Sequence, residues 1–259
     1  IVESDGGWTL SFRQLHPVED WNAQISLLTG FVAAKIQLDG GAGVLRTLPA
    51  AQSDAVRRLK RAAATIGVPW NDGESYPDFV RRLDPNDPQQ LAVLMKCTVL
   101  FRGADYRTFM GGAPDEDLAQ AALGAEYAHT TAPLRRLVDR YVLETCLAHT
   151  AGRDVPQWVL DGFETLPEIM RDSGRRARAY ERGVMDIAEA LMLAGREGQL
   201  MEGVLVDVNP KNGRGVVQIP DSAVELSVNA NPNDVGELIQ VRIDHVDVEQ
   251  GKVKLTRVN

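Results

Sequence analysis

The feature that most limits the possible folds is a change of pattern near residue 198. From Gln199 onward, apolar β-branched residues alternate with polar ones, and the runs are separated by the turn-rich segments NPKNGRG, NANPND and EQGK. Alternation with a period of two predicts strands, and short turn segments between strands predict hairpins. About five strands fit into residues 199–259, which is the size of a small barrel of the OB type. We therefore place a domain boundary near residue 198.

The first part of the chain, residues 1–198, is dominated by helical periodicity. A short strand pattern at 7–14 precedes Pro17, where a long helix over 16–36 is expected to begin. Its large apolar residues recur at helical spacing and predict a buried stripe: Val18, Trp21, Ile25, Leu28 and Val32. Further helices are expected at 53–68, 87–101, 114–127, 133–149, 155–170 and 171–196. The fold class is therefore α+β, with a mostly helical first part and a β-barrel at the end.

The composition is that of a globular chain, with 44% hydrophobic and 25% charged residues. No stretch has the roughly 18 uninterrupted apolar residues of a membrane span, so we expect a cytoplasmic protein without a membrane partner. Cys97 and Cys146 lie in apolar runs, which indicates buried thiols in a reducing compartment. The net charge of −8 argues against indiscriminate nucleic-acid binding but leaves room for a local basic channel.

Most of the 28 basic residues are arginine. This bias suits bidentate contacts with phosphate, because the guanidinium group presents a planar fork of N–H donors. Taken alone, the base composition of a GC-rich genome is the simpler explanation of the same bias.

The segment YAHTTAPLRRLVD, residues 127–139, places two adjacent arginines where a helix is expected to begin. Pro133 after a threonine cap predicts the helix start. The apolar residues expected on its packed face are Leu134, Leu137, Val138, Tyr141 and Val142. The first turn of a helix favours acidic residues, so Arg135 and Arg136 make sense there if an anion such as phosphate occupies the site. Alternatively, both pair with acidic neighbours such as Asp139 or Glu126.

The same segment resembles the signature Y-x-H-F-T-S-P-I-R-R-Y-x-D of the RNase II (RNB) family of exoribonucleases. The matching positions are Tyr127, His129, Thr131, Pro133, Arg135, Arg136 and Asp139. The segment departs from the signature by Thr130 for Phe, Ala132 for Ser and Leu137 for Tyr.

Two further segments resemble motifs of this family, in the family's order. Residues 16–36 are similar to I-V-E-E-x-M-I-x-A-N-x-x-A-A, with Glu19 and Asp20 on the acidic positions and Ser26 where Asn is usual. The segment RRARAYERGVMD is similar to R-R-x-x-x-A-E-R-x-x-x-D and places Glu181 and Arg182 on its Glu-Arg pair.

The family ends in an S1-type OB barrel. The resemblance therefore assigns residues 1–198 to the C-terminal part of an RNB domain and residues 199–259 to an S1-type barrel.

This resemblance implies 3′ to 5′ hydrolysis of single-stranded RNA to nucleoside monophosphates with the help of Mg²⁺. It implies two catalytic residues: Arg135 as the cation on the scissile phosphate, and Glu181 in contact with the terminal nucleotide. It also implies a set of RNA-binding residues. Glu19 and Asp20 would position the 3′ end, and Tyr127, His129 and Thr131 would line the channel floor. Arg136 and Arg182 complete the set.

One family motif is missing. The family binds its metal through an aspartate cluster, D-P-x-x-x-x-D-x-D-D-A, which neither LDPNDPQQL nor APDEDLAQ fits. We expect the Mg²⁺ ligands in an N-terminal part of the same protein, no metal ligand in residues 1–259, and no cleavage by this chain alone. The alternative is a non-catalytic RNA-binding protein of RNB fold that lacks the metal cluster. We expect a monomer in either case.

The expected barrel departs from an RNA-gripping S1 domain. Residues 201–259 contain nine acidic and six basic residues, a net charge of −3, and no Phe, Tyr or Trp follows Tyr180. Aromatic stacking and a basic groove supply most of the affinity of OB folds for single strands. The barrel is therefore either a structural lid or a weak RNA guide, and the sequence leaves both open.

Overall fold

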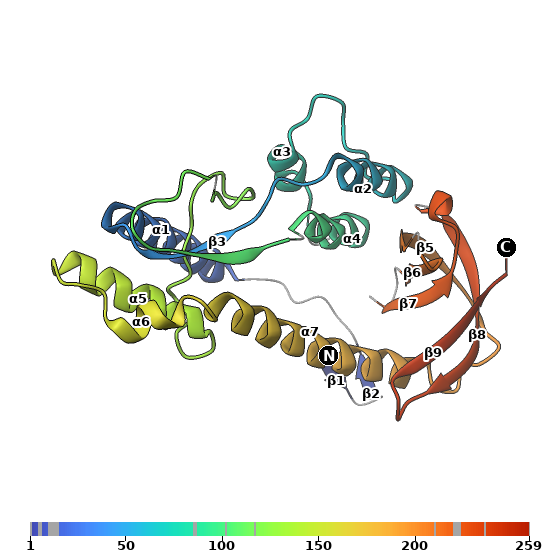
Figure 1. Ribbon diagram of the computed structural model, residues 1–259. Coiled ribbons are helices and arrows are strands. Elements are labelled where there is room, and N and C mark those ends of the chain that lie inside the picture. Colours follow the sequence, from blue (N-terminus) through green and yellow to red (C-terminus); the bar gives the residue numbers. More distant parts are fainter. Residues whose placement is uncertain are drawn as a thin grey trace. The chain divides into compact units, whose positions relative to one another are not determined.

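Figure 1 shows the computed structural model of the chain, which describes residues 2–4, 7–9, 16–84, 87–101, 103–116, 118–209, 211–219, 224–235 and 237–258. The chain forms two compact units. Unit 1 contains residues 1–14, 52–100 and 179–259, and unit 2 contains residues 15–51 and 101–178. Helix α7 (Leu166–Leu193) is continuous and contributes residues to both units.

Unit 2 is built around a two-stranded sheet. Strands β3 (Gly43–Thr47) and β4 (Asp105–Phe109) are antiparallel, and Arg46 lies opposite Tyr106. Helices α1 (Pro17–Gly40) and α5 (Leu137–Thr150) pack on β3 and on each other, and α6 (Gln157–Gly162) packs on α5. The core joins the strands to these helices through Leu45, Val138, Val142, Val159, Phe163 and Leu166. The sequence did not predict β3 or β4.

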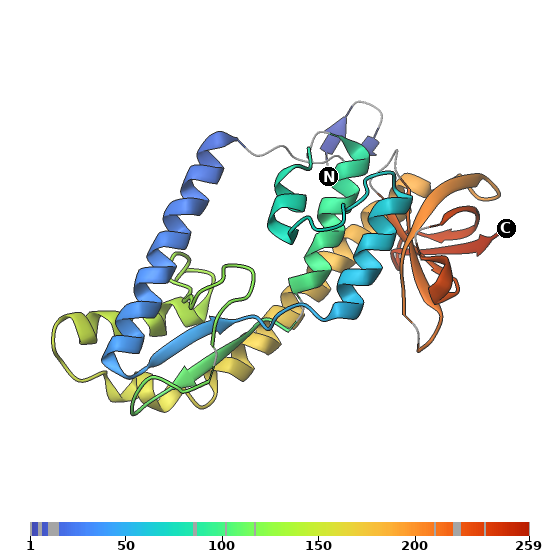
Figure 2. The ribbon, with the colours of Figure 1, turned by 90° about the horizontal axis from the view of Figure 1, so that it is seen from above.

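Helix α1 is confirmed, but the prediction that its apolar stripe is buried is wrong. Its stripe residues are all exposed, at 60% for Val18, 66% for Trp21, 62% for Ile25, 62% for Leu28 and 50% for Val32. The buried residues of α1 are instead Gly30, Ala33, Ala34 and Gln37, and the three small ones allow a close approach to neighbouring elements. The N-terminal half of α1 extends beyond the other elements of unit 2 (Figure 2).

The helix expected at 114–127 is wrong. The part of this segment that the structure describes is a turn at 121–124, closed by the pairing of Gln120 with Ala125. The side-chain oxygen Oε1 of Gln120 accepts the backbone N–H of Ala122 at 2.7 Å, and Gly124 has a φ of +66°. A side chain that captures local backbone N–H groups competes with the helix, and glycine allows the left-handed conformation that ends it.

Unit 1 contains a helical cluster that confirms the helices expected at 53–68 and 87–101. Helices α2 (Ser53–Thr65), α3 (Tyr76–Arg81) and α4 (Pro88–Cys97), followed by the 3₁₀ turn η1 (Thr98–Phe101), pack around the fully buried Phe79. Helix α3 was not expected.

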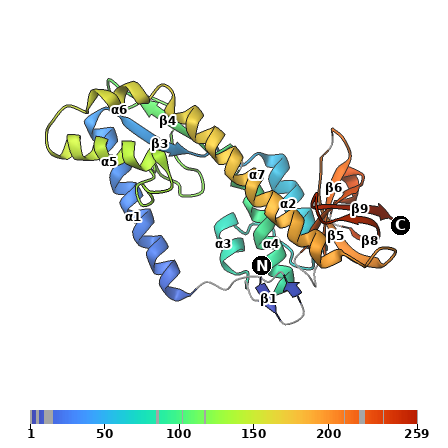
Figure 3. The same cartoon turned by 90° about the horizontal axis from the view of Figure 1, so that it is seen from below.

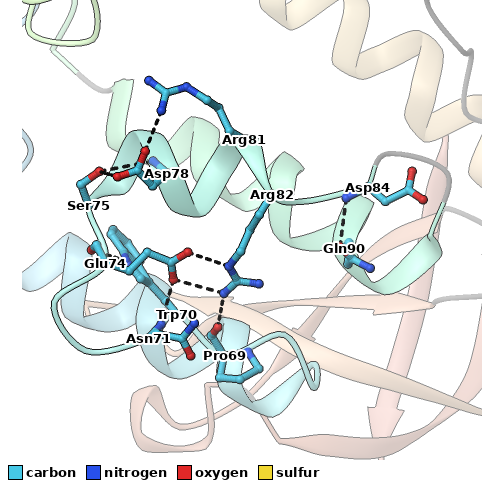
Figure 4. Close-up of polar contacts among 10 residues, drawn as sticks. All are labelled: Pro69, Trp70, Asn71, Glu74, Ser75, Asp78, Arg81, Arg82, Asp84 and Gln90. Atoms are coloured by element: carbon cyan, nitrogen blue, oxygen red, sulfur yellow. Dashed lines mark hydrogen bonds and ion pairs between the residues drawn. The ribbon is translucent and has the colours of Figure 1, made fainter.

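Polar contacts around α3 hold the segment before it in place (Figure 4). Trp70 stacks on Phe79 at 4.7 Å between ring centroids and donates its Nε1–H to the Glu74 carbonyl at 2.9 Å. Arg82 Nε lies 2.6 Å from Glu74 Oε1, and Ser75 caps the helix by accepting the Asp78 N–H. These bonds connect the turn to the cluster core.

The rest of unit 1 is the expected barrel. Strands β5 (Leu200–Val208), β6 (Arg214–Ile219), β7 (Val224–Asn229), β8 (Leu238–Asp247) and β9 (Lys252–Arg257) form an antiparallel sheet in the order β7-β6-β5-β8-β9. The edge strands β7 and β9 approach each other, so the sheet nearly closes (Figures 1 and 3). A 3₁₀ turn, η3 (Pro232–Asp234), lies between β7 and β8. The inward residues, including Leu205, Val217 and Ile243, form the core.

The strand pattern expected at 7–14 is partly seen. Strand β2 (Gly7–Thr9) pairs antiparallel with β1 (Val2–Ser4). Residues 10–14 lie outside the described part of the chain.

Candidate functional site

The loop before α5 is fixed by a buried carboxylate. Asp139 is fully buried, and its Oδ1 accepts the backbone N–H of Ala132 at 2.7 Å and the Arg136 Nη2 at 2.9 Å. Its Oδ2 accepts the Arg136 Nε at 2.8 Å, which completes a bidentate ion pair. Because every partner is a hydrogen-bond donor, the buried charge is compensated. The loop is thereby held in one conformation.

The expected helix start is wrong by one turn. Helix α5 begins at Leu137, not Pro133, and Arg136 is its N-cap with an extended backbone. Pro133, Leu134 and Arg135 form a turn outside the helix, and Leu134 is 93% exposed instead of packed. The acidic residue favoured in a first turn is Asp139, and it binds the loop. The two arginines therefore do not form a helix N-terminal anion site.

The two arginines differ in their surroundings. Arg136 pairs with Asp139, which confirms for this residue alone the alternative interpretation that both arginines pair with acidic neighbours. Arg135 is exposed, and no described carboxylate lies within ion-pair distance of its guanidinium. Arg135 is therefore the one of the two that is available for a ligand.

A hollow of about 720 Å³ in unit 2 brings Arg135 together with other arginines. The arginines that line it are Arg46, Arg135, Arg136, Arg171, Arg175 and Arg178. Arg171 pairs with Asp105 at 2.8 Å and Arg175 with Asp172 at 2.7 Å. Arg46 and Arg178, like Arg135, have no carboxylate within ion-pair distance among the residues that the structure describes. Glu168 also lines the hollow, but the arginines outnumber the carboxylates there, and this excess of positive charge favours an anion.

Tyr106 and His129 also line the hollow. The Oη of Tyr106 and the Nδ1 of His129 are 2.8 Å apart. The pKa of His129 is lowered to about 4, first by burial and then by the charges of Arg136 and Arg46. His129 is therefore neutral near pH 7. A neutral imidazole adds a hydrogen-bonding group to the hollow without adding charge.

Tyr127 and Thr131 lie beside the hollow rather than in its lining. Tyr127 is 8% exposed, and its ring packs edge-on against Phe31 and His129. A Cβ on Gly30 would lie 2.0 Å from the Tyr127 ring, so only glycine allows this close approach. Thr131 is exposed. The neighbouring Thr130 Oγ1 is buried without a hydrogen-bond partner, in a position where the family signature has Phe.

The acidic residues of the expected site lie elsewhere. Glu19 is in the first turn of α1, and its Oε2 accepts the His16 backbone N–H at 2.8 Å. Asp20 is exposed beside it, and neither residue lines the hollow.

The Glu-Arg pair on α7 belongs to the part of that helix in unit 1. Glu181 is exposed, whereas Arg182 pairs with Asp186 at 2.7 Å and lies 3.7 Å from Glu189. Burial raises the pKa of Glu189 to about 7, and its Oε1 accepts the backbone N–H of Glu225 on β7.

Several lining residues were not singled out from the sequence. Arg171, Arg175 and Arg178 are spaced by four and three positions, which places them on one face of α7. This spacing could have predicted a basic face from the sequence. Arg46 and Tyr106 had no such signal, because β3 and β4 were not predicted and their pairing joins residues far apart in the sequence.

The described residues do not supply a site for Mg²⁺. No group of three or more His, Cys, Asp or Glu residues among them is arranged to hold a metal ion. Asp105 and Asp172, which line or border the hollow, are each bound to an arginine. The residues present therefore do not fit a catalytic metal centre, which requires clustered carboxylates.

The barrel carries a second hollow, of about 630 Å³, on β6, β7, β8 and β9. Its charged and imidazole side chains are Arg214, His245, Asp247, Lys252 and Lys254. Arg214 Nε donates to Ser227 Oγ at 3.3 Å, and Lys252 Nζ donates to Gln250 Oε1 at 2.6 Å. Basic residues thus gather on one side of a barrel whose net charge is negative.

Comparison with known proteins gives one family match: residues 199–258 match the RNase II-type exonuclease C-terminal S1 domain. No curated protein matches the sequence. RNase R of Mycoplasma genitalium is similar in structure over 97% of this chain, with 13% identity and a TM-score of 0.70 for its apo form. Its complex with ribose-methylated single-stranded RNA gives a TM-score of 0.71 at 13% identity over the same share. The resemblance to the RNase II family is confirmed by the family model for residues 199–258, and the solved structures confirm the fold.

The chain has the fold of the C-terminal region of RNase R and spans 43% of the length of that protein. Yeast Ssd1, a pseudonuclease, is similar over 86% of this chain and 29% of its own length, with 14% identity and a TM-score of 0.55. In the described part of the chain, no helix has the length and apolar character needed to cross a membrane.

Proposed function

We propose that this chain is the RNA-binding C-terminal part of an RNase II-type 3′ to 5′ exoribonuclease that acts on single-stranded RNA in the cytoplasm. The observation that carries the proposal is the hollow of unit 2, in which Arg46, Arg135 and Arg178 have no carboxylate partner among the described residues. A phosphodiester chain supplies the anionic oxygens that such groups bind through charge-assisted hydrogen bonds.

In this proposal Arg135 is the cation on the scissile phosphate. Negative charge on the phosphate oxygens increases during hydrolysis, so a guanidinium that donates to them stabilises the transition state more than the ground state. The Asp139–Arg136 ion pair would hold the loop in place so that Arg135 needs little reorganisation. His129 would offer a neutral hydrogen-bonding group, and Glu181 would contact the terminal nucleotide.

The proposal places the Mg²⁺ ligands, and hence the water-activating half of the site, in another part of the protein. The exposed apolar face of α1, formed by Val18, Trp21, Ile25, Leu28 and Val32, supports this. Exposed apolar patches rimmed by polar residues mark interaction surfaces. We propose that the N-terminal part of the same protein covers this face in a monomer, and that Glu19 and Asp20 then approach the 3′ end of the RNA.

A second candidate is a non-catalytic RNA-binding protein of the same fold. It is favoured by one observation, the lack of a metal-holding group among the described residues. Both candidates bind RNA through the hollow, and they differ in whether carboxylates elsewhere complete a metal site.

The test uses end-labelled oligo(A) with and without Mg²⁺. We expect this chain alone to bind the oligomer without cleaving it, and a longer protein that contains it to release mononucleotides. In the longer protein, Arg135→Ala should lower turnover by about 10² or more. Arg153→Ala, which changes an exposed arginine outside the hollow, is the control. Cleavage by this chain alone would contradict the missing metal ligands, and wild-type turnover of Arg135→Ala would contradict the phosphate role.

A further inference from the structure

Arg46 is held in the hollow from two directions. Its backbone N–H donates to the carbonyl oxygen of Tyr127 at 2.7 Å, which ties β3 to the loop that carries Arg135. Its partner across the sheet is Tyr106, and the Arg46 Cζ lies over the Tyr106 ring at 4.7 Å from the centroid. A guanidinium stacked on an aromatic ring keeps its N–H edges directed sideways, where a ligand can reach them.

The charge of Arg46 is only partly exposed to solvent. The residue is half-buried, and no described carboxylate lies within ion-pair distance of it. The pKa of His129 is lowered by desolvation, then by the charge of Arg136, and then by the charge of Arg46. The charge of Arg46 therefore acts on the groups beside it. Removing a cation from water without a counter-charge is unfavourable. Arg136 avoids this cost through Asp139, and Arg46 would avoid it when an anion occupies the hollow.

We propose that Arg46 binds a backbone phosphate of the RNA in addition to the phosphate bound by Arg135, and that Tyr106 positions its guanidinium. This inference rests on the proposed function, in which the hollow holds single-stranded RNA. It adds a binding residue on β3, outside the three sequence motifs. The ring on which Arg46 stacks also contacts His129, through the Tyr106 hydroxyl at 2.8 Å from Nδ1.

The test measures the salt dependence of oligo(A) binding by this chain, using fluorescence anisotropy. Each ionic contact with a single-stranded phosphate contributes about 0.7 to the slope of log Kobs against log salt concentration. Arg46→Gln should reduce the slope by about 0.7 and weaken binding about tenfold at low salt. Arg135→Gln should reduce the slope by a similar amount, and Arg153→Gln should leave the slope and the affinity unchanged.

Variants of Tyr106 separate positioning from packing. Tyr106→Phe keeps the ring under Arg46 and should retain most of the affinity. Tyr106→Leu removes the ring and should weaken binding several-fold while leaving the salt slope unchanged, because the charge of Arg46 remains. Arg46→Lys should behave like Tyr106→Leu, since lysine keeps the charge but not the planar stack. Equal affinity of Arg46→Lys and the wild type would contradict the stacked geometry.

The outcomes distinguish this inference from the proposed function. If the slope falls for Arg135→Gln but not for Arg46→Gln, Arg46 is not a phosphate-binding residue, although the hollow still binds RNA. If neither variant changes the slope, the proposed function itself is wrong. Circular dichroism verifies that each variant is folded. If Arg46→Gln does not fold, Arg46→Lys and Tyr106→Leu decide the question, and wild-type affinity in both would overturn the inference.

Discussion

The hollow of unit 2 and the hollow of the barrel are both lined by basic side chains, but they hold these side chains differently. In unit 2, Arg46 is half-buried on the Tyr106 ring, and Arg135 lies in a loop fixed by the buried Asp139. On the barrel, Arg214, Lys252 and Lys254 are exposed, and the barrel sequence contains no Phe, Tyr or Trp. A flexible exposed lysine loses side-chain entropy when it binds, whereas a stacked guanidinium has already lost most of it.

This difference favours one of the two roles left open for the barrel. A preorganised hollow binds phosphate at a defined position, and an open hollow with mobile cations attracts RNA without positioning it. Under the proposed function, we therefore expect unit 2 to determine where the phosphates lie and the barrel to be a weak guide. Four predictions test the contrast, in order of decreasing expected effect.

The fixed loop of unit 2 depends on the charge of Asp139. Asp139→Asn leaves Arg136, whose side chain is only 20% exposed, without its counter-charge. We expect the free energy of unfolding to fall by about 3 kcal/mol, measured by urea denaturation. The control is Asp39→Asn, because Asp39 pairs with Lys35 on the surface and such pairs contribute below about 1 kcal/mol. Equal effects of the two substitutions would show that the loop is not fixed by the buried pair.

The two units should respond to pH in opposite directions. The pKa of His129 is about 4 when folded and 6.5 ordinarily, so between these values the unfolded chain binds more protons. Acidification from pH 6.5 to 4 should therefore lower the free energy of unfolding of unit 2, by about 2 kcal/mol, and His129→Gln should remove this dependence.

In unit 1, the pKa of Glu189 is raised by burial from 4.5 to about 7. The folded state binds the extra proton between these values, so unit 1 should lose stability as the pH rises from 4.5 to 7. Glu189→Gln should remove this second dependence. Urea denaturation at each pH measures both stability dependences, and NMR titration measures the pKa of His129. A His129 pKa near 6.5 would contradict its burial.

The loop before α5 contains one energetically unfavourable group, the buried Thr130 hydroxyl, which has no hydrogen-bond partner. Thr130→Val removes the hydroxyl at constant shape and should raise the free energy of unfolding by about 1 kcal/mol. Thr131→Val, at the neighbouring exposed position, should change it by less than about 0.5 kcal/mol. Thermal and urea unfolding measure both variants. Destabilisation by Thr130→Val would indicate that the hydroxyl has a partner when the protein is folded.

The smallest effect is expected at the barrel. Replacing Lys252 and Lys254 together by Gln should weaken oligo(A) binding about twofold at low salt, because exposed mobile cations contribute little individually. The matched comparison is Arg135→Gln in unit 2, measured by anisotropy under the same conditions. A tenfold loss for the lysine pair would reverse the contrast and make the barrel the main RNA-binding part.

Local patterns predicted the elements that depend on short-range order. The alternation after Gln199 predicted the barrel, and helical periodicity predicted α1, α2, α4 and the part of α7 after residue 170. The helix expected at 155–170 is instead divided between α6 and the first turn of α7. Two of the wrong predictions involve a side chain that binds backbone N–H groups within its own segment. The Asp139 side chain accepts the Ala132 N–H, and α5 begins at Leu137 rather than at Pro133. The Gln120 side chain accepts the Ala122 N–H, and its segment forms a turn instead of a helix. Strands β3 and β4 were missed because each is short and is stabilised by a partner about 60 positions away.

The sequence alone determined the fold class, the barrel and the family resemblance, because these follow from periodicity and from motifs of adjacent residues. Tertiary structure decided which of two neighbouring arginines is available for a ligand, since a buried carboxylate binds Arg136 and leaves Arg135 exposed. It also decided that Arg46, on a strand that the sequence did not reveal, lines the same hollow. The burial of Asp139 and the pairing of β3 with β4 depend on which distant segments meet, whereas the Arg136–Asp139 ion pair joins residues only three positions apart.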